Sequence, residues 1–117
     1  MRIEIVPIGK PRMTRADRWK GRECVERYWV YKDELRLRLP NYTLPQCLAI
    51  EFQLAMPESW SERKKQKFDG QPHQQKPDLD NLLKAWMDCF ADSDAYVSEI
   101  HARKTWARTG AIILPDD

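Results

Sequence analysis

Four charged residues in the second half of the chain could carry chemistry, namely Asp78, Asp80, Lys84 and Asp94. Three carboxylates brought together repel one another unless a divalent cation neutralises them, and oxygen ligands that leave room for water suit Mg²⁺, with Mn²⁺ as an alternative. Such an ion can activate water and shield the charge that develops on a phosphate. Lys84 would share a helix face with Asp80 and could offer positive charge to the same phosphate. The set therefore indicates metal-assisted hydrolysis of a phosphodiester.

The same residues also have an ordinary structural interpretation, and their spacing leaves both open. Asp78 can cap a helix and Asp80 can lie in its first turn, where free amides and the positive end of the helix dipole favour ionised carboxylates. Asp80 and Lys84 can form a surface ion pair, and Asp88 is expected to be solvated. A helix of about 12 residues is ~18 Å long. The chain must therefore fold back after the helix before the strand that follows Asp94 can pass near Asp78.

The helix that would carry Asp78 and Asp80 is indicated by the strongest apolar periodicity in the chain. From Pro77 onward, apolar residues recur at the spacing of one helical stripe, which predicts packing against a sheet. They are Leu79, Leu82, Leu83, Trp86, Met87 and Phe90. After a short connection, residues 95–106 predict a strand, and the Arg108-Thr109-Gly110 turn predicts a hairpin between this strand and residues 111–114.

The upstream sequence predicts two further strands and two further helices. Residues 2–8 alternate as a first strand would, and residues 25–39 show helical spacing. Residues 44–56 alternate strictly and predict a core-facing central strand, after which Ser59 can cap a short basic helix that ends at Lys67. Because the 117 residues show no repeat or linker, they predict one α+β domain over residues 1–117, with helices packed on a small mixed sheet.

Positive charge is concentrated near the N-terminus. Residues 1–40 hold eleven Lys and Arg against six Asp and Glu, whereas residues 77–117 hold four against eight. Most of the excess lies in a stretch that Pro11 and Gly21 mark as a loop, and such a stretch suits a DNA phosphate backbone. The candidate DNA-binding residues are Lys10, Arg12, Arg15, Arg18, Lys20 and Lys76. A merely solvated surface is the alternative for this loop and for the basic helix, which is a second candidate DNA contact.

Cysteine and histidine usage argues against a metal site with soft ligands. Cys24, Cys47 and Cys89 are odd in number, far apart and never in a Cys-x-x-Cys pair, so we expect reduced thiols, most of them in the core, and neither a zinc site nor a disulfide framework. His73 and His101 are too scattered to predict an imidazole site. No apolar run approaches a membrane span, and the first residues do not suit a signal peptide. A cytoplasmic protein without membrane contact is therefore expected.

One stretch of the chain resembles a known family. The segment Lys76-Pro77-Asp78-Leu79-Asp80-Asn81-Leu82-Leu83-Lys84-Ala85, with Asp88 and then Asp94-Ala95-Tyr96-Val97, looks like the RusA family of Holliday-junction resolvases. The similarity is specific over residues 76–104 and looser upstream, where a first strand precedes the basic Lys10-Pro11-Arg12 segment. Many members of this family come from phages or prophages.

The resemblance implies a site, a substrate and an assembly. It implies that Asp78, Asp80 and Asp94 bind magnesium and that Lys84 is essential for catalysis. It further implies a homodimer that binds four-way DNA junctions and cuts two opposing strands, leaving ends that a ligase can seal. A two-fold dimer suits a two-fold substrate.

Three points stay open at the level of sequence. Family members commonly carry adjacent acids before the final strand, whereas this chain has Asp92-Ser93-Asp94, so Asp92 is the alternative to Asp94 as third ligand. A non-catalytic module for branched DNA would keep the acids as helix caps and would act without metal. A metal nuclease for flaps or RNA would keep the same acids and differ only in the surface that recognises substrate shape.

Overall fold

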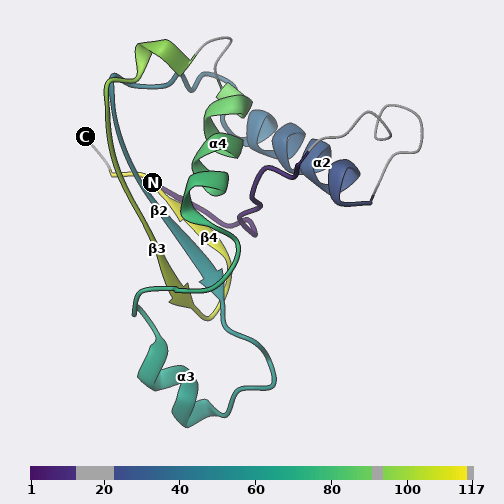
Figure 1. Cartoon of the computed structure of the whole chain (residues 1–117), viewed down its shortest axis with the longest axis vertical. Coiled ribbons are helices and arrows are strands. Elements are labelled where there is room, and N and C mark those ends of the chain that lie inside the picture. Colours follow the sequence, from purple (N-terminus) through teal and green to yellow (C-terminus); the bar gives the residue numbers. More distant parts are fainter. Residues whose placement is uncertain (13–22, 91–93, 116–117) are drawn as a thin grey trace.

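A four-stranded sheet, one helix packed against it and a second helix packed on the first make up the body of the protein (Figure 1). The computed structural model describes residues 1–12, 23–90 and 94–115. In chain order the elements are β1 (Arg2–Ile3), α2 (Glu23–Arg38), β2 (Cys47–Ala55), α3 (Glu62–Phe68), α4 (Leu79–Phe90), the 3₁₀ turn η1 (Asp94–Tyr96), β3 (Glu99–Ala107) and β4 (Ala111–Ile113). The predicted α+β class with a mixed sheet is confirmed.

The sheet has the order β1-β4-β2-β3, with β2 parallel to β3 and antiparallel to β4. The predicted hairpin between the last two strands is therefore wrong, since β2 separates β3 from β4. A turn signal shows that the chain reverses but does not identify the partner of the next strand. Ala111 and Ile112 are completely buried, and this burial is reached by inserting β4 between β1 and β2 rather than leaving it at the sheet edge.

The N-terminal segment runs in the sheet for a shorter distance than predicted. Only Arg2 and Ile3 pair with β4, and the chain then leaves the sheet and passes close to the turn before β4. A Cβ atom on Gly110 would lie 2.9 Å from the Cα of Val6, so this turn requires a residue without a side chain. The close passage directs residues 5–10 toward the helices.

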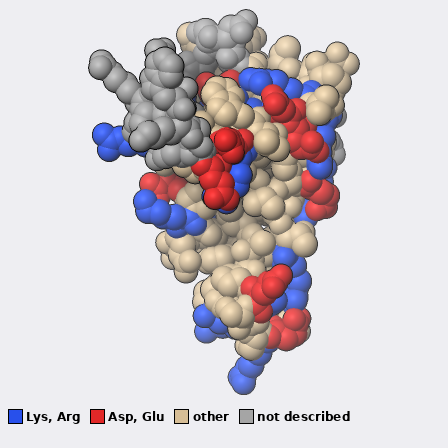
Figure 2. Space-filling view, turned by 90° about the vertical axis from the view of Figure 1, so that its right-hand side faces the viewer, with Lys and Arg blue, Asp and Glu red and all other residues tan. Residues whose placement is uncertain are grey.

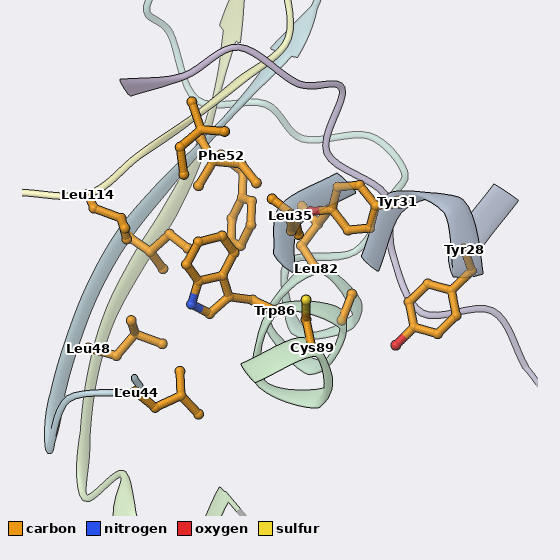
Figure 3. Close-up of a cluster of buried hydrophobic side chains, with 14 of the residues drawn as sticks. Tyr28, Tyr31, Leu35, Leu44, Leu48, Phe52, Leu82, Trp86, Cys89 and Leu114 are labelled. Carbon is orange, nitrogen blue, oxygen red and sulfur yellow. The ribbon is translucent and has the colours of Figure 1, made fainter. Parts of the chain in front are cut away.

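The core lies between the sheet and α4 (Figure 3). β2 alternates as predicted, with its buried residues on the helix side and its neighbours on the opposite face. The side chains of Phe52, Leu82 and Trp86 are completely buried. The predicted apolar stripe of α4 faces this core, and Ala85 and Cys89 join it. Burial of a large aromatic side chain contributes about 2–3 kcal/mol, so Trp86 is a principal anchor of α4.

The other two helices differ from their predictions in detail. In α2 the buried aromatic residues are Tyr28 and Tyr31, whereas Trp29 is half exposed. α3 is capped by Ser61 rather than by Ser59, because the Ser61 hydroxyl accepts a hydrogen bond from the N–H of Lys64. Within the described part of the chain, no helix has the length and apolar character needed to cross a bilayer.

Candidate active site

The start of α4 presents Asp78 and Asp80 to solvent. The Asp78 carbonyl oxygen accepts hydrogen bonds from the N–H groups of Asn81 and Leu82, both at 3.1 Å, which places Asp78 at the N-cap position. Asp80 lies in the first turn, where a negative side chain interacts favourably with the helix dipole. Both residues are exposed. The two carboxylates therefore stand one residue apart at an open helix end.

Lys84 lies on the same face of α4 as Asp80. Its Nζ is 3.6 Å from Asp80 Oδ2, and both side chains are more than 60% exposed. The ion pair that the sequence left open is thus formed. An exposed pair of this kind contributes little to stability, about 0.3–0.5 kcal/mol, so either side chain can turn to another partner at small cost.

Two distant segments hold the start of α4 in place. The Lys104 ammonium, on the helix side of β3, donates to the carbonyl oxygen of Pro77 at 2.8 Å and also to that of Gln75. From the other side, the N–H of Lys10 donates to the carbonyl oxygen of Asn81 at 3.0 Å. Sequence reasoning missed Lys104, whose only signal was a charged residue at an inward position of a strand.

The contact made by Lys10 brings the basic segment to the candidate site. Gly9 packs closely here, since a Cβ on it would lie 3.2 Å from the Cβ of Asn81. Arg12 follows and is exposed, and Lys76, also exposed, lies two residues before Asp78. Arg15, Arg18 and Lys20 lie outside the described residues. The structure therefore joins the start of the basic segment to the acidic end of α4.

The charged surface is mixed around α4 and more basic around α3. Figure 2 shows acidic and basic side chains interleaved over the main body and over the projecting lobe. Arg63, Lys64 and Lys67 of α3 are all exposed. Part of this basic surface is ordered, because Lys64 Nζ lies 4.2 Å from the centre of the Trp60 ring.

Asp88 is exposed, as expected, but it also makes specific contacts that the sequence did not predict. Its carboxylate accepts hydrogen bonds from the Tyr28 hydroxyl at 2.7 Å and from the Lys32 ammonium at 2.9 Å, and Lys10 Nζ lies 3.7 Å away. Burial alone would raise the pKa of Asp88, but these hydrogen bonds and the charges of Lys32 and Lys10 outweigh it, so the pKa lies below its ordinary value. Asp88 therefore ties α2 to α4 and neutralises a buried lysine.

Asp94 lies at the opposite end of α4 from Asp78. Its backbone belongs to η1, at the end of the sheet where β2 and β3 begin (Figure 1). The 12 residues of α4 span about 18 Å at a rise of ~1.5 Å per residue. β3 does run back past the start of α4, as a three-carboxylate site would require. The part of this strand that lies near the start of α4 is Lys104, and Asp94 is far from it. Asp92, the alternative ligand, lies outside the described residues.

The acidic helix end fits a hard divalent cation. Asp78 and Asp80 offer only carboxylate oxygens, and their exposure leaves space for the water ligands that Mg²⁺ retains. Among the described side chains, no third ligand joins these two within 4.8 Å. The Asp78–Asp80 pair thus matches the common mode in which one or two carboxylates and a substrate phosphate share the ion.

His73 fixes the loop that leads into the candidate site. It is buried and lies against the Trp106 ring, with 4.1 Å between ring centres. Its backbone N–H donates a hydrogen bond to the Lys104 carbonyl oxygen at 3.1 Å. Its ring Nδ1 accepts a hydrogen bond from the backbone N–H of Gln75 at 3.4 Å. His73 therefore has a structural role.

Acidification is expected to destabilise the protein through His73. Burial, followed by the charge of Lys104, lowers the pKa of His73 below its ordinary value of 6.5. The unfolded chain therefore takes up a proton at a higher pH than the native state does, and stability is lost as the pH falls below this ordinary value toward the native pKa. Urea unfolding between about pH 7.5 and 5 measures the effect. We expect a smaller pH dependence in His73→Gln, and an identical dependence in both proteins would contradict this role.

Comparison with known proteins gives one match. The family described as Endodeoxyribonuclease RusA matches residues 4–114, nearly the whole chain. The matched range includes the start of α4, the basic segment and the strands β2, β3 and β4, whereas β1 lies just before it. No match was found among curated proteins.

Proposed function

The chain belongs to the RusA endodeoxyribonuclease family, and we propose that it is a Mg²⁺-dependent endonuclease that resolves four-way DNA junctions by paired cuts in opposing strands. The observation that carries this proposal is the helix end at which Asp78, Asp80 and Lys84 are exposed together while Lys10 and Lys76 lie beside it. Carboxylates for a metal and ammonium groups for phosphates are the two elements that phosphodiester hydrolysis requires.

Each residue at the start of α4 has a proposed role. Asp78 and Asp80 hold Mg²⁺ through carboxylate oxygens, with Mn²⁺ as a possible substitute. An ion bound there would supply an activated water and would neutralise charge on the scissile phosphate. Lys84 leaves its exposed ion pair with Asp80 and donates to a phosphate oxygen, where it stabilises the charge that develops in the transition state.

Asp94 enters the proposal as the third carboxylate through the family resemblance. In the described conformation about one length of α4 separates it from Asp78, so it would reach the same ion only after a rearrangement or from a second copy of the chain. Asp92 is the alternative third ligand. Asp94→Asn and Asp92→Asn, compared for cleavage at saturating Mg²⁺, distinguish the two.

The proposed substrate is a four-way DNA junction and the proposed assembly is a homodimer, and the two are matched in symmetry. Lys10, Arg12, Arg15, Arg18, Lys20 and Lys76 are proposed to bind the phosphate backbone. A homodimer places two copies of the α4 site in a two-fold arrangement, which a four-way junction can match and a single flap cannot. Two sites acting on one junction also account for paired cuts.

Substrate choice tests the proposed function against its alternatives. We would compare labelled four-way junction, flap, linear duplex and structured RNA of matched length, each with Mg²⁺ or with chelator. The proposal predicts metal-dependent cutting confined to the junction, at symmetric positions in two strands. Preferential cutting of the flap or RNA would favour another metal nuclease, and binding without cutting would favour a non-catalytic module.

Removing charge from the basic segment is expected to weaken junction binding in a salt-dependent way. Each phosphate contact releases counterions, so Arg12→Gln with Arg15→Gln should reduce the slope of log affinity against log salt concentration by about 2. Fluorescence anisotropy over a salt series measures the slope. The charge-matched control is Arg2→Gln with Arg27→Gln, which changes exposed residues of β1 and α2. An unchanged slope in the first variant would exclude this segment from the interface.

A further inference from the structure

Three potential metal ligands meet on the face of the sheet opposite α4. The parallel register of β2 and β3 pairs Cys47 with Glu99 and Ala49 with His101. Because side chains alternate between the two faces of a strand, Cys47, Glu99 and His101 project from the same face. One sulfur, one oxygen and one nitrogen ligand atom lie within 4.8 Å of one another. These residues are more than 50 positions apart at the extremes, which explains why the sequence did not predict them as a group.

Glu99 already bridges the other two side chains. The Cys47 thiol donates to Glu99 Oε2 at 3.1 Å, and His101 Nε2 lies 2.7 Å from the same oxygen. The hydrogen bond to Glu99 raises the pKa of the Cys47 thiol, and the contacts with His101 and then Cys47 lower the pKa of Glu99. The Glu99 carboxylate thus accepts hydrogen bonds from both side chains, and a cation bound among the three could replace these contacts.

We propose that Cys47, Glu99 and His101 form a zinc-binding site. Zinc binds sulfur at about 2.3 Å and nitrogen or oxygen at about 2.0–2.2 Å, so tetrahedral ligand atoms lie about 3.4–3.6 Å apart. The Cys47–Glu99 and His101–Glu99 contacts, at 3.1 and 2.7 Å, are shorter than this spacing. Small rotations of these exposed side chains would lengthen them to it. A thiolate, a carboxylate and a neutral imidazole also balance the two positive charges of the ion.

The surroundings leave the fourth coordination position open. The side chains of His101 and Glu99 are 67% and 61% exposed, so no buried group obstructs the ion. Beside His101 the same face is hollowed by ≈ 350 Å³ between residues that include Ala49 and Ile113. A water molecule or a ligand from another molecule can occupy this position, as in zinc sites that retain an exchangeable ligand.

This site differs from the acidic end of α4 in chemistry and in place. The proposed Mg²⁺ ligands there are only oxygen atoms, whereas sulfur and nitrogen select a softer ion. α4 and the Cys47 side chain lie on opposite faces of the sheet. Zinc binding should therefore persist when Asp80 is replaced, and the two sites can be tested separately.

Binding to the proposed site can be measured with Co²⁺ in place of Zn²⁺, because cobalt bound to a thiolate absorbs light. Tag-free protein with reduced thiols should take up one Co²⁺ per chain, with a thiolate-to-cobalt absorption band that Zn²⁺ abolishes by displacement. Cys47→Ser should remove this band, and His101→Gln should weaken binding at least about tenfold. Because a thiol proton is released, affinity should rise with pH.

The matched control is Cys24→Ser, which removes a thiol from α2 and should keep the band. Circular dichroism establishes that each variant is folded, and the exposed positions of Cys47 and His101 make retention of the fold the expected result. Wild-type protein without the cobalt band, or a Cys47→Ser protein that keeps it, would overturn the proposal. A zinc site that remains in a protein unable to cut junctions would leave this inference intact and contradict only the proposed nuclease function.

Discussion

Asp80→Asn is expected to lower the rate of junction cleavage about 10³-fold, while folding and junction binding change little. The substitution keeps the size of the side chain but removes a charged metal ligand, and stabilisation of several kcal/mol in the transition state corresponds to a factor of this size. Asp80 is exposed and forms an ion pair with the surface lysine Lys84. Single-turnover cleavage at saturating protein separates this loss from any change in affinity.

The matched control for Asp80→Asn is Asp33→Asn. Asp33 is also exposed and also pairs with a basic residue on its own helix, with 3.6 Å between Asp33 Oδ1 and Arg36 Nη1. It lies on α2 and should leave cleavage within about twofold of the wild type. If Asp80→Asn instead retained cleavage, or lost binding and stability together, Asp80 would be a structural acid.

Asp88→Ala is expected to cost about 2 kcal/mol of unfolding free energy. Lys32 is only 6% exposed at its side chain, and removing its carboxylate partner leaves a buried ammonium that contacts only the Tyr28 and Trp29 rings among the described cation–π partners. Breaking a fully buried ion pair costs about 3–5 kcal/mol of unfolding free energy. We expect the smaller cost of about 2 kcal/mol here because Asp88 is partly exposed. The lowered pKa of Asp88 means that its stabilisation is present at neutral pH and is lost as the pH falls below the ordinary value of 3.8.

A double-mutant cycle tests the origin of this cost. Lys32→Met removes the buried charge, so adding Asp88→Ala in that background should cost less than half as much as it does alone. Urea denaturation at neutral pH measures all four proteins. Equal costs in both backgrounds would show that Asp88 stabilises the helices independently of Lys32.

The features that sequence predicted well depend on local patterns. The stripe of α4 and the alternation of β2 arise from the burial of one face, and each pattern is complete within one element. Asp78 and Asp80 were placed correctly at the start of α4 because capping preference is also local. The start of α3 was predicted less accurately, since its N-cap residue is Ser61 and not Ser59.

The features that sequence missed depend on pairing between distant segments. Nothing in the turn before β4 indicated that β2 would lie between the last two strands. The contacts of Asp88 were missed because its partners, Tyr28 and Lys32, come from a helix about 60 positions earlier. Likewise, the strand register alone brings Cys47 to Glu99, and the fold of the chain after α4 determines how far Asp94 lies from Asp78.

Cleavage of a supercoiled plasmid that extrudes a cruciform is the most direct test of the central claim. Two symmetric cuts at the base of the cruciform convert the plasmid to a linear product, whereas a single cut gives a nicked circle. The account predicts linear product with Mg²⁺, none with chelator, and none from Asp80→Asn protein that still binds the junction. Cutting that persists in chelator, or protein that binds the cruciform in Mg²⁺ and never cuts it, would contradict a metal-dependent resolvase.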